Sequence, residues 1–195
     1  MNLPKQVPQL PKLLENPLRF FRPTGELTGP LSTKIFVSSS ATDADLFVIL
    51  QAFSPESKEA DFQGTVDPRS PLAQGCLGAS HRKLDMASSK PYRPFYSHDE
   101  ILPVTPHEVC ELDVEIWPTC VILPAGYRIG TQISGHDFER EPSGDADGVW
   151  VSRGSGPWLH TSPVDRPKSI FGGKATIHMD SATASYLTLP DIAPH

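Results

Sequence analysis

The stretch GASHRKLD brings a serine, a histidine and an aspartate close together, at Ser80, His81 and Asp85. These are the residue types of a serine-hydrolase triad, in which the histidine takes the proton of the serine hydroxyl and the aspartate orients the histidine. The spacing argues against this chemistry. A nucleophile elbow reads G-x-S-x-G on a strand-to-helix turn, and Arg82 stands where the second glycine is required. In an extended segment, neighbouring side chains such as Ser80 and His81 also point to opposite faces.

We therefore expect no catalytic residue in this segment and interpret it as a structural polar network that ties the end of a strand to the following loop. The members of this network are Ser80, His81, Arg82 and Asp85. Arg82 could anchor a carboxylate through paired hydrogen bonds. The alternative is residual hydrolysis by Ser80 with a histidine from elsewhere in the chain, such as His160 or His178.

Two carboxylates, Asp43 and Asp45, stand directly before an apolar segment and could bind a structural cation. Aspartates at this place also commonly form the turn that begins a strand, and both interpretations stay open. The three cysteines include no CxxC pair, which argues against a zinc site and against a disulfide framework. The sequence therefore predicts neither a catalytic metal nor a cofactor.

Aromatic and polar side chains in the irregular parts of the chain are further candidates. Trp150 and Trp158 lie in a glycine-rich stretch and could line a loop that binds a carbohydrate or another small ligand. Trp117 follows a strand-like segment and is expected to pack in the core. The polar run GHDFER, which includes His136 and Asp137, is expected to face solvent.

The elements that must position these residues show a hydrophobic period of two, which is typical of strands. In VCELDVEIWP (109–118) apolar and acidic residues alternate, which predicts a half-buried antiparallel strand with one wet face. DLFVILQAF (45–53) is apolar on both faces and is expected to be a central strand. Further short strands are predicted in the segments LSTKIFVS, YRIGTQIS, KATIHM and SYLTLP. With 21 prolines spread over 195 residues, long helices are not expected, and a β-sandwich or barrel is predicted.

Composition and charge narrow the function classes. The net charge is −6 and no Lys/Arg-rich run occurs, so nucleic acid is not expected as a partner. No apolar run has the length of a membrane span, and the N-terminus lacks a signal-peptide core, so we expect a cytoplasmic protein. Residues 1–17 contain Pro4, Pro8 and Pro11 and are interpreted as an extended arm that precedes one domain at 18–195. Long irregular stretches at about 85–107 and 138–173 are expected to carry binding.

Several blocks together resemble a known family. SSATDADLFV, ASHRKLD, EIWPT, AGYRI and ISGHDF, in this order and spacing, are similar to the C-terminal domain of X-Pro dipeptidyl-peptidases and CocE/NonD hydrolases. The resemblance extends from about residue 18 to residue 190. It implies a jelly-roll β-sandwich of the galactose-binding-domain-like type, in agreement with the predicted strands.

The resemblance also implies what this chain lacks. In that family a separate α/β-hydrolase domain carries the Ser-Asp-His triad, and no G-x-S-x-G occurs in this sequence. The expected function is therefore that of an accessory jelly-roll module without its own active site. We expect it to pack on an α/β-hydrolase domain or subunit, or to form a homo-oligomer through the same apolar surface. The alternative is a carbohydrate- or small-ligand-binding module.

Overall fold

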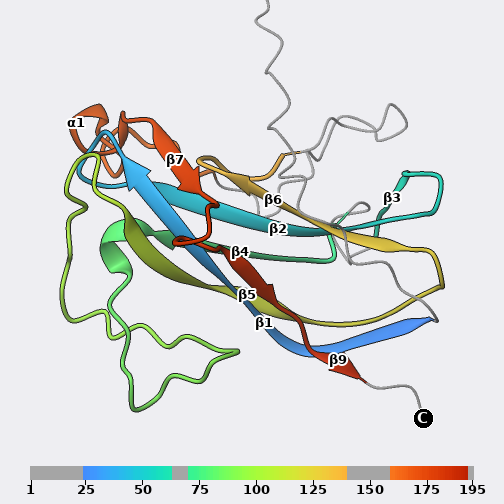
Figure 1. Ribbon diagram of the computed structural model, residues 1–195. Helices are drawn as coiled ribbons and strands as arrows, with labels where there is room; N and C mark the ends of the chain where they lie inside the picture. Colours follow the sequence, from blue (N-terminus) through green and yellow to red (C-terminus); the bar gives the residue numbers. More distant parts are fainter. Residues whose placement is uncertain (1–23, 63–69, 140–158, 193–195) are drawn as a thin grey trace, which may run out of the picture.

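The computed structural model describes residues 24–62, 70–139 and 159–192, which form two antiparallel sheets packed face to face (Figure 1). The prediction of an all-β sandwich is confirmed, while the galactose-binding-domain-like topology stays a prediction. The proposed boundary between residues 17 and 18 lies outside the described residues.

The longest strand, β1 (Gly25–Ser39), organises the five-stranded sheet. Along one edge it pairs with β5 (Cys110–Leu123). Its other edge pairs in succession with three short strands, β7 (Ala175–His178), β8 (Tyr186–Thr188) and β9 (Asp191–Ile192). The register between β1 and β5 shifts between Gly29 and Leu31, at Pro30, which cannot donate a hydrogen bond to the ladder.

The second sheet has four strands and is built on β2 (Asp45–Phe53). β2 pairs with β4 (Ala73–Gly78) on one side and with β6 (Arg128–Ser134) on the other, and its end pairs with β3 (Glu59–Ala60). Seven of the nine residues of β2 are buried, so the prediction of a central strand covered on both faces is confirmed.

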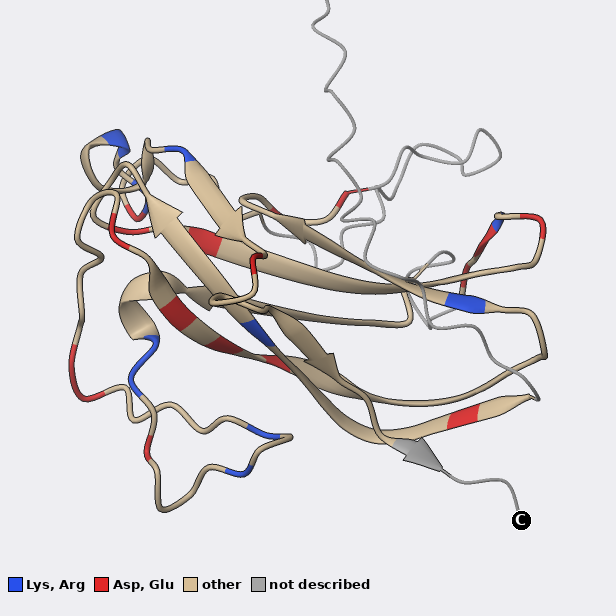
Figure 2. Ribbon diagram, in the orientation of Figure 1, with Lys and Arg blue, Asp and Glu red and all other residues tan. Residues whose placement is uncertain are grey.

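The core lies between the sheets and follows the alternation that the sequence shows. On β5, Leu112, Val114 and Ile116 are fully buried, whereas the intervening acidic residues lie on the outer face of the sheet. Lys34 of β1 is opposite Asp113 in the ladder and forms ion pairs with Asp113 and Glu111. Figure 2 shows a basic position of β1 beside acidic positions of β5. Burial of the apolar side chains stabilises each strand far more than the exposed ion pairs do.

Helical structure in the described residues is limited to one turn of 3-10 helix at Ala79–His81 and a short helix, α1 (Lys168–Phe171), which follows Pro167. Two expectations about local structure were wrong. Trp117 lies within β5, and 61% of it is exposed, because it continues the outward-facing positions of the strand. Asp137 is buried instead of facing solvent, because it receives hydrogen bonds from a distant segment.

Candidate functional site

The residues of the segment GASHRKLD (78–85) form separate contacts with their surroundings. Ser80 is only 3% exposed, and its main-chain N–H donates to Asp43 Oδ1 at 2.9 Å. His81, the next residue, is exposed and lines a pocket beside the β4 end. The 3-10 turn thus turns the serine inward and the histidine outward.

The other two members of the predicted network, Arg82 and Asp85, form hydrogen bonds with main-chain groups. Arg82 donates to the carbonyl oxygens of Ala79 and Leu102, so it holds the turn to the long loop and does not anchor a carboxylate in these contacts. Asp85 accepts hydrogen bonds from the N–H groups of Ala87 and Ser88. The Ser88 hydroxyl and these N–H groups hold the pKa of the Asp85 carboxyl below its usual value.

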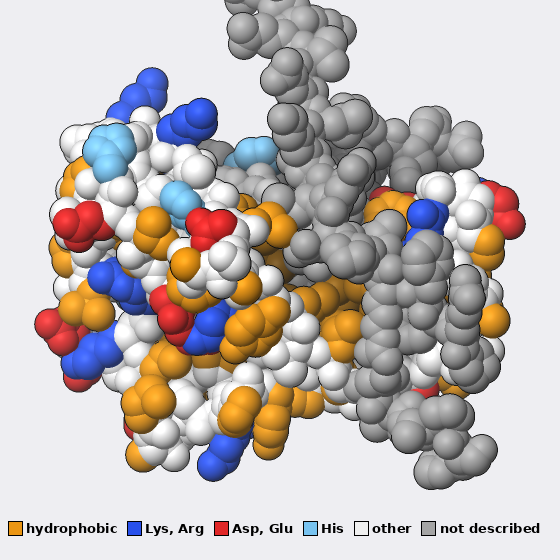
Figure 3. Space-filling model, viewed as in Figure 1, with side chains coloured by type: hydrophobic (Ala, Val, Ile, Leu, Met, Phe, Trp, Pro, Cys, Tyr) orange, Lys and Arg blue, Asp and Glu red, His pale blue; other side chains and the backbone are white. Residues whose placement is uncertain are grey.

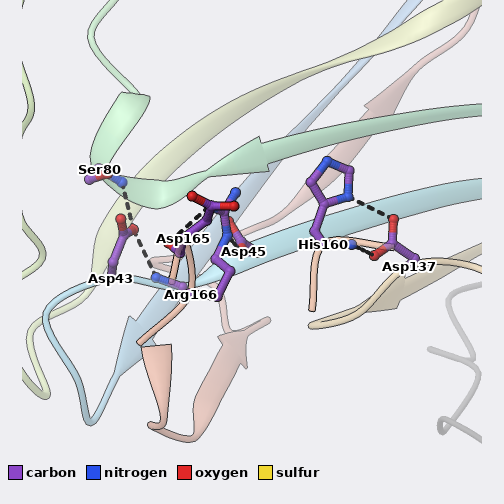
Figure 4. A network of polar contacts seen from close by, with 8 residues as sticks. Asp43, Asp45, Ser80, Asp137, His160, Asp165 and Arg166 are labelled. Atoms are coloured by element: carbon purple, nitrogen blue, oxygen red, sulfur yellow. Dashed lines mark hydrogen bonds and ion pairs between the residues drawn. The ribbon is translucent and has the colours of Figure 1, made fainter. Parts of the chain in front are cut away.

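Asp43 and Asp45, the proposed cation ligands, have protein donors. Asp43 is buried and accepts the N–H groups of Ala44 and Ser80. Asp45 Oδ2 accepts Arg166 Nε at 2.5 Å (Figure 4), and the Arg166 guanidinium also lies over the ring of Phe171. Within the described ranges, no three His, Cys, Asp or Glu side chains are placed to hold a metal ion together.

A second polar pair is formed by Asp137 and His160, of which His160 lines the same pocket as Asp45 and Arg166. Asp137 follows β6, is 3% exposed, and accepts two hydrogen bonds from His160: one from the main-chain N–H at 2.7 Å and one from Nδ1 at 2.8 Å. A carboxylate can only accept, so Nδ1 carries a proton and Nε2 faces away from Asp137 (Figure 4). This is an oriented imidazole with an acidic partner.

The pocket between these groups has a volume of about 340 Å³. It is bounded by the first residues of β2, the last residues of β4, the 3-10 turn, the 85–107 loop and the segment before α1. Polar side chains from all of these elements reach it, namely Asp45, Cys76, His81, His98, His160 and Arg166. Two apolar rings, those of Phe47 and Tyr96, form part of its wall.

Cys76 is the thiol of this pocket. It is opposite Phe47 in the β2–β4 ladder, and the Phe47 ring lies 5.6 Å from the His160 ring. Burial raises the pKa of the Cys76 thiol, and the nearby carboxylates of Asp137 and Asp45 raise it further, against the opposing effect of Arg166. The thiol is therefore protonated at neutral pH.

Sequence reasoning identified part of this geometry. The sequence analysis assigns other roles to Asp45 and His81, weighs Cys76 only for a zinc site or a disulfide, and gives Arg166 no role. His160 was considered only as a partner of Ser80, yet Figure 4 places these two residues apart with Asp45 and Arg166 between them. His178 bonds the Ser38 hydroxyl across β1 and β7 instead. The candidate ligand-binding residues Trp150 and Trp158 lie outside the described residues.

Comparison with known proteins identifies the fold's relatives. The family described as the X-Pro dipeptidyl-peptidase C-terminal non-catalytic domain matches residues 21–188. The chain belongs to this family. The resemblance inferred from the sequence blocks is thereby confirmed, and the described sandwich is a PepX C-terminal domain.

Longer proteins contain segments similar to this PepX C-terminal domain. Two proteins named as serine esterases, from Mycobacterium bovis and Mycobacterium tuberculosis, are each 32% identical to it over 150 residues. The match covers 73% of this chain but only 22% of each relative.

Solved structures support the fold. A CocE/NonD family hydrolase from Staphylococcus aureus superposes with a TM-score of 0.73 at 21% identity, over 90% of this chain and 30% of the hydrolase. An α-amino acid ester hydrolase superposes with a TM-score of 0.55 at 14% identity, over 89% of this chain and 24% of the other. In the described residues, no helix is long and apolar enough to span a membrane.

Proposed function

We propose that this chain is the accessory β-sandwich of a CocE/NonD-type serine hydrolase. It packs against an α/β-hydrolase domain or subunit that carries the catalytic serine, and it helps to shape the substrate cleft. The observation that carries this proposal is the match of residues 21–188 to a non-catalytic domain family, together with the small share that the match covers of each longer relative.

The outer face of the five-stranded sheet is the surface that we assign to this contact. Trp117 of β5 and Tyr186 of β8 are exposed on it, because Tyr186 is opposite the outward-facing Lys34 in the ladder. The neighbouring loop adds the exposed rings of Tyr92 and Phe95. Figure 3 shows hydrophobic side chains gathered in the lower part of the view, where this loop lies. Large exposed aromatic side chains are typical of surfaces that a partner covers.

A domain exchange tests the proposal. In the Mycobacterium bovis relative, the segment that matches this chain is deleted in one variant and replaced by this chain in another. We expect the deletion to lose most of the hydrolysis of 4-nitrophenyl butyrate and the exchange to restore it. An unrelated β-sandwich at the same place is the control and should restore nothing. An exchange protein that is folded but as inactive as the deletion would contradict the proposal.

The isolated chain provides the complementary measurement. Because the matched family is non-catalytic, we expect no sustained turnover of 4-nitrophenyl butyrate or of an X-Pro 4-nitroanilide by the purified domain. Repeated turnover that disappears when one of its own side chains is replaced would contradict the proposal.

A further inference from the structure

We propose that Cys76 is a reactive thiol that accepts an acyl group from an activated ester, with His160 as the general base and Asp137 as the residue that positions the imidazole. The reaction is a single acyl transfer to the protein, and it does not depend on a hydrolase partner. It therefore goes beyond the proposed accessory function.

His160 has a fixed orientation. Asp137 is buried and binds both the main-chain N–H and the ring Nδ1–H of His160, which fixes the position and the tautomer of the ring. Nε2 therefore carries the lone pair that can accept a proton. A base that a third group holds in this way can activate a cysteine or serine side chain that comes within its reach.

Cys76 and His160 share one pocket. Cys76 and His160 both line the 340 Å³ space, and both neighbour the Phe47 side chain, Cys76 through the β-ladder and His160 through ring contact. The carboxylate of Asp137, the partner of His160, also raises the pKa of the Cys76 thiol. The space has room for a small acyl ester, and its rings provide an apolar wall.

The Cys76 thiol needs a base in order to react. Partial burial and two carboxylates raise the pKa of the Cys76 thiol, so a free thiolate is scarce at neutral pH. Other charged or titratable groups also line the pocket: Asp45, His81, Tyr96, His98 and Arg166. Among the histidines, His160 is the one held by a buried carboxylate through its ring nitrogen. We therefore assign the proton transfer to its Nε2.

The reaction transfers the acyl group of the ester to Cys76, and His160 carries the proton between the two. The Cys76 thiol gives its proton to His160 Nε2 while Sγ attacks the carbonyl carbon of the ester. A C–S bond forms and the ester C–O bond breaks. The leaving alkoxide or phenolate takes the proton from His160, which returns to the neutral state, and a thioester remains on Cys76.

The purified chain is tested with 4-nitrophenyl acetate near neutral pH. Release of 4-nitrophenolate is followed by absorbance, and the acetyl group is located by peptide mass spectrometry. Cys120 is the internal reference, because, like Cys76, it is an exposed thiol, but it lies on the outer face of the other sheet, in contact with the Thr28 hydroxyl. We expect Cys76 to be acetylated about 100-fold faster than Cys120, as general-base assistance allows.

Variants separate a base-assisted thiol from a merely accessible one. His160→Gln should bring the rate at Cys76 close to that at Cys120, and Asp137→Asn should give an intermediate rate. His178→Gln is the matched control, because His178 bonds Ser38 outside the pocket, and it should leave the ratio unchanged. Thermal unfolding of each variant shows whether a change in ratio comes from the folded protein.

Three results would overturn the proposal. The first is equal acetylation of Cys76 and Cys120 in the unaltered protein, a comparison that needs no variant to fold. The second is a ratio that His160→Gln leaves unchanged in a folded protein. The third is a ratio that His81→Gln abolishes and His160→Gln does not, which would assign the base to His81.

Discussion

The hydroxyl group of Tyr96 completes the edge of β5, the outermost described strand of its sheet. It donates to the Asp113 carbonyl oxygen at 2.7 Å and accepts the Glu115 N–H at 3.1 Å. Tyr96→Phe removes both hydrogen bonds and leaves two partly buried main-chain groups unpaired. We expect the free energy of unfolding to fall by about 1–3 kcal/mol, measured by urea denaturation. Tyr92→Phe, at an exposed ring on the same loop, is the control and should change little.

Tyr96 should also make the free energy of unfolding depend on pH. Burial raises the pKa of Tyr96 to about 12, whereas an unfolded tyrosine titrates near 10. Between about pH 10 and pH 12 the unfolded state binds fewer protons at this site, so its contribution to stability falls as the pH rises. The stability difference between the unaltered chain and Tyr96→Phe should therefore narrow across this window. A constant difference would contradict the assignment.

Single substitutions can also test the role of Asp43. Its carboxylate joins the turn before β2 to the 3-10 turn by accepting two N–H groups. Asp43→Ala should lower the free energy of unfolding by about 2 kcal/mol, and Asp43→Asn, which keeps an acceptor oxygen, should lose less. Because protein donors serve both Asp43 and Asp45, added Ca²⁺ should leave the Tm unchanged. A rise in Tm that disappears in Asp43→Asn would favour the cation interpretation.

Among the elements, β4 approaches β5 of the opposite sheet closely at Gly75. A Cβ atom on Gly75 would lie 2.0 Å from the Glu115 carbonyl oxygen of β5. Gly75→Ala must push the two strands apart, and we expect a loss of about 3 kcal/mol or failure to fold. The matched control is Gly135→Ala, where the nearest atom, the Asp45 carbonyl oxygen, is 3.8 Å away. Equal stability of the two variants would contradict this account.

The elements also show how far the sequence could predict the fold. β2 and β5 were predicted because burial on one or both faces leaves a pattern in the side chains themselves. β4, with the sequence AQGCLG, was not predicted, because Gly75 and Gly78 have no side chain to contribute to a pattern. Gly75 is needed for an approach that only the packed sheets reveal.

The candidate site was less predictable than the strands for a similar reason. Asp137 and His160 are 23 positions apart, and their pairing depends on how the chain returns after β6. Cys76 joins them through its place opposite Phe47 in a ladder whose register the sequence does not display. Convergence of distant side chains is a property of tertiary structure, so only residue types could be proposed in advance.

At the scale of the whole molecule, we expect the outer face of the five-stranded sheet to bind the hydrolase domain. Trp117→Arg places a charge on this face at a position that is already 61% exposed, so the Tm of the isolated chain should change little. In the exchange protein, the same variant should reduce restored hydrolysis by about tenfold or more, since aromatic anchors dominate interfaces. Val164→Arg, at an exposed position outside this sheet, is the control. Equal activity of both variants would assign the contact to another surface.

β1 has a final consequence for how the molecule is made. Among the described strands, β7, β8 and β9 complete its second edge, and they begin only at residue 175, more than 130 positions after β1 ends. While the ribosome is still translating the middle of the message, the nascent polypeptide therefore exposes a long run of unpaired amide and carbonyl groups. Such an edge invites aggregation, and chaperones that hold nascent chains should raise the yield of this protein during expression.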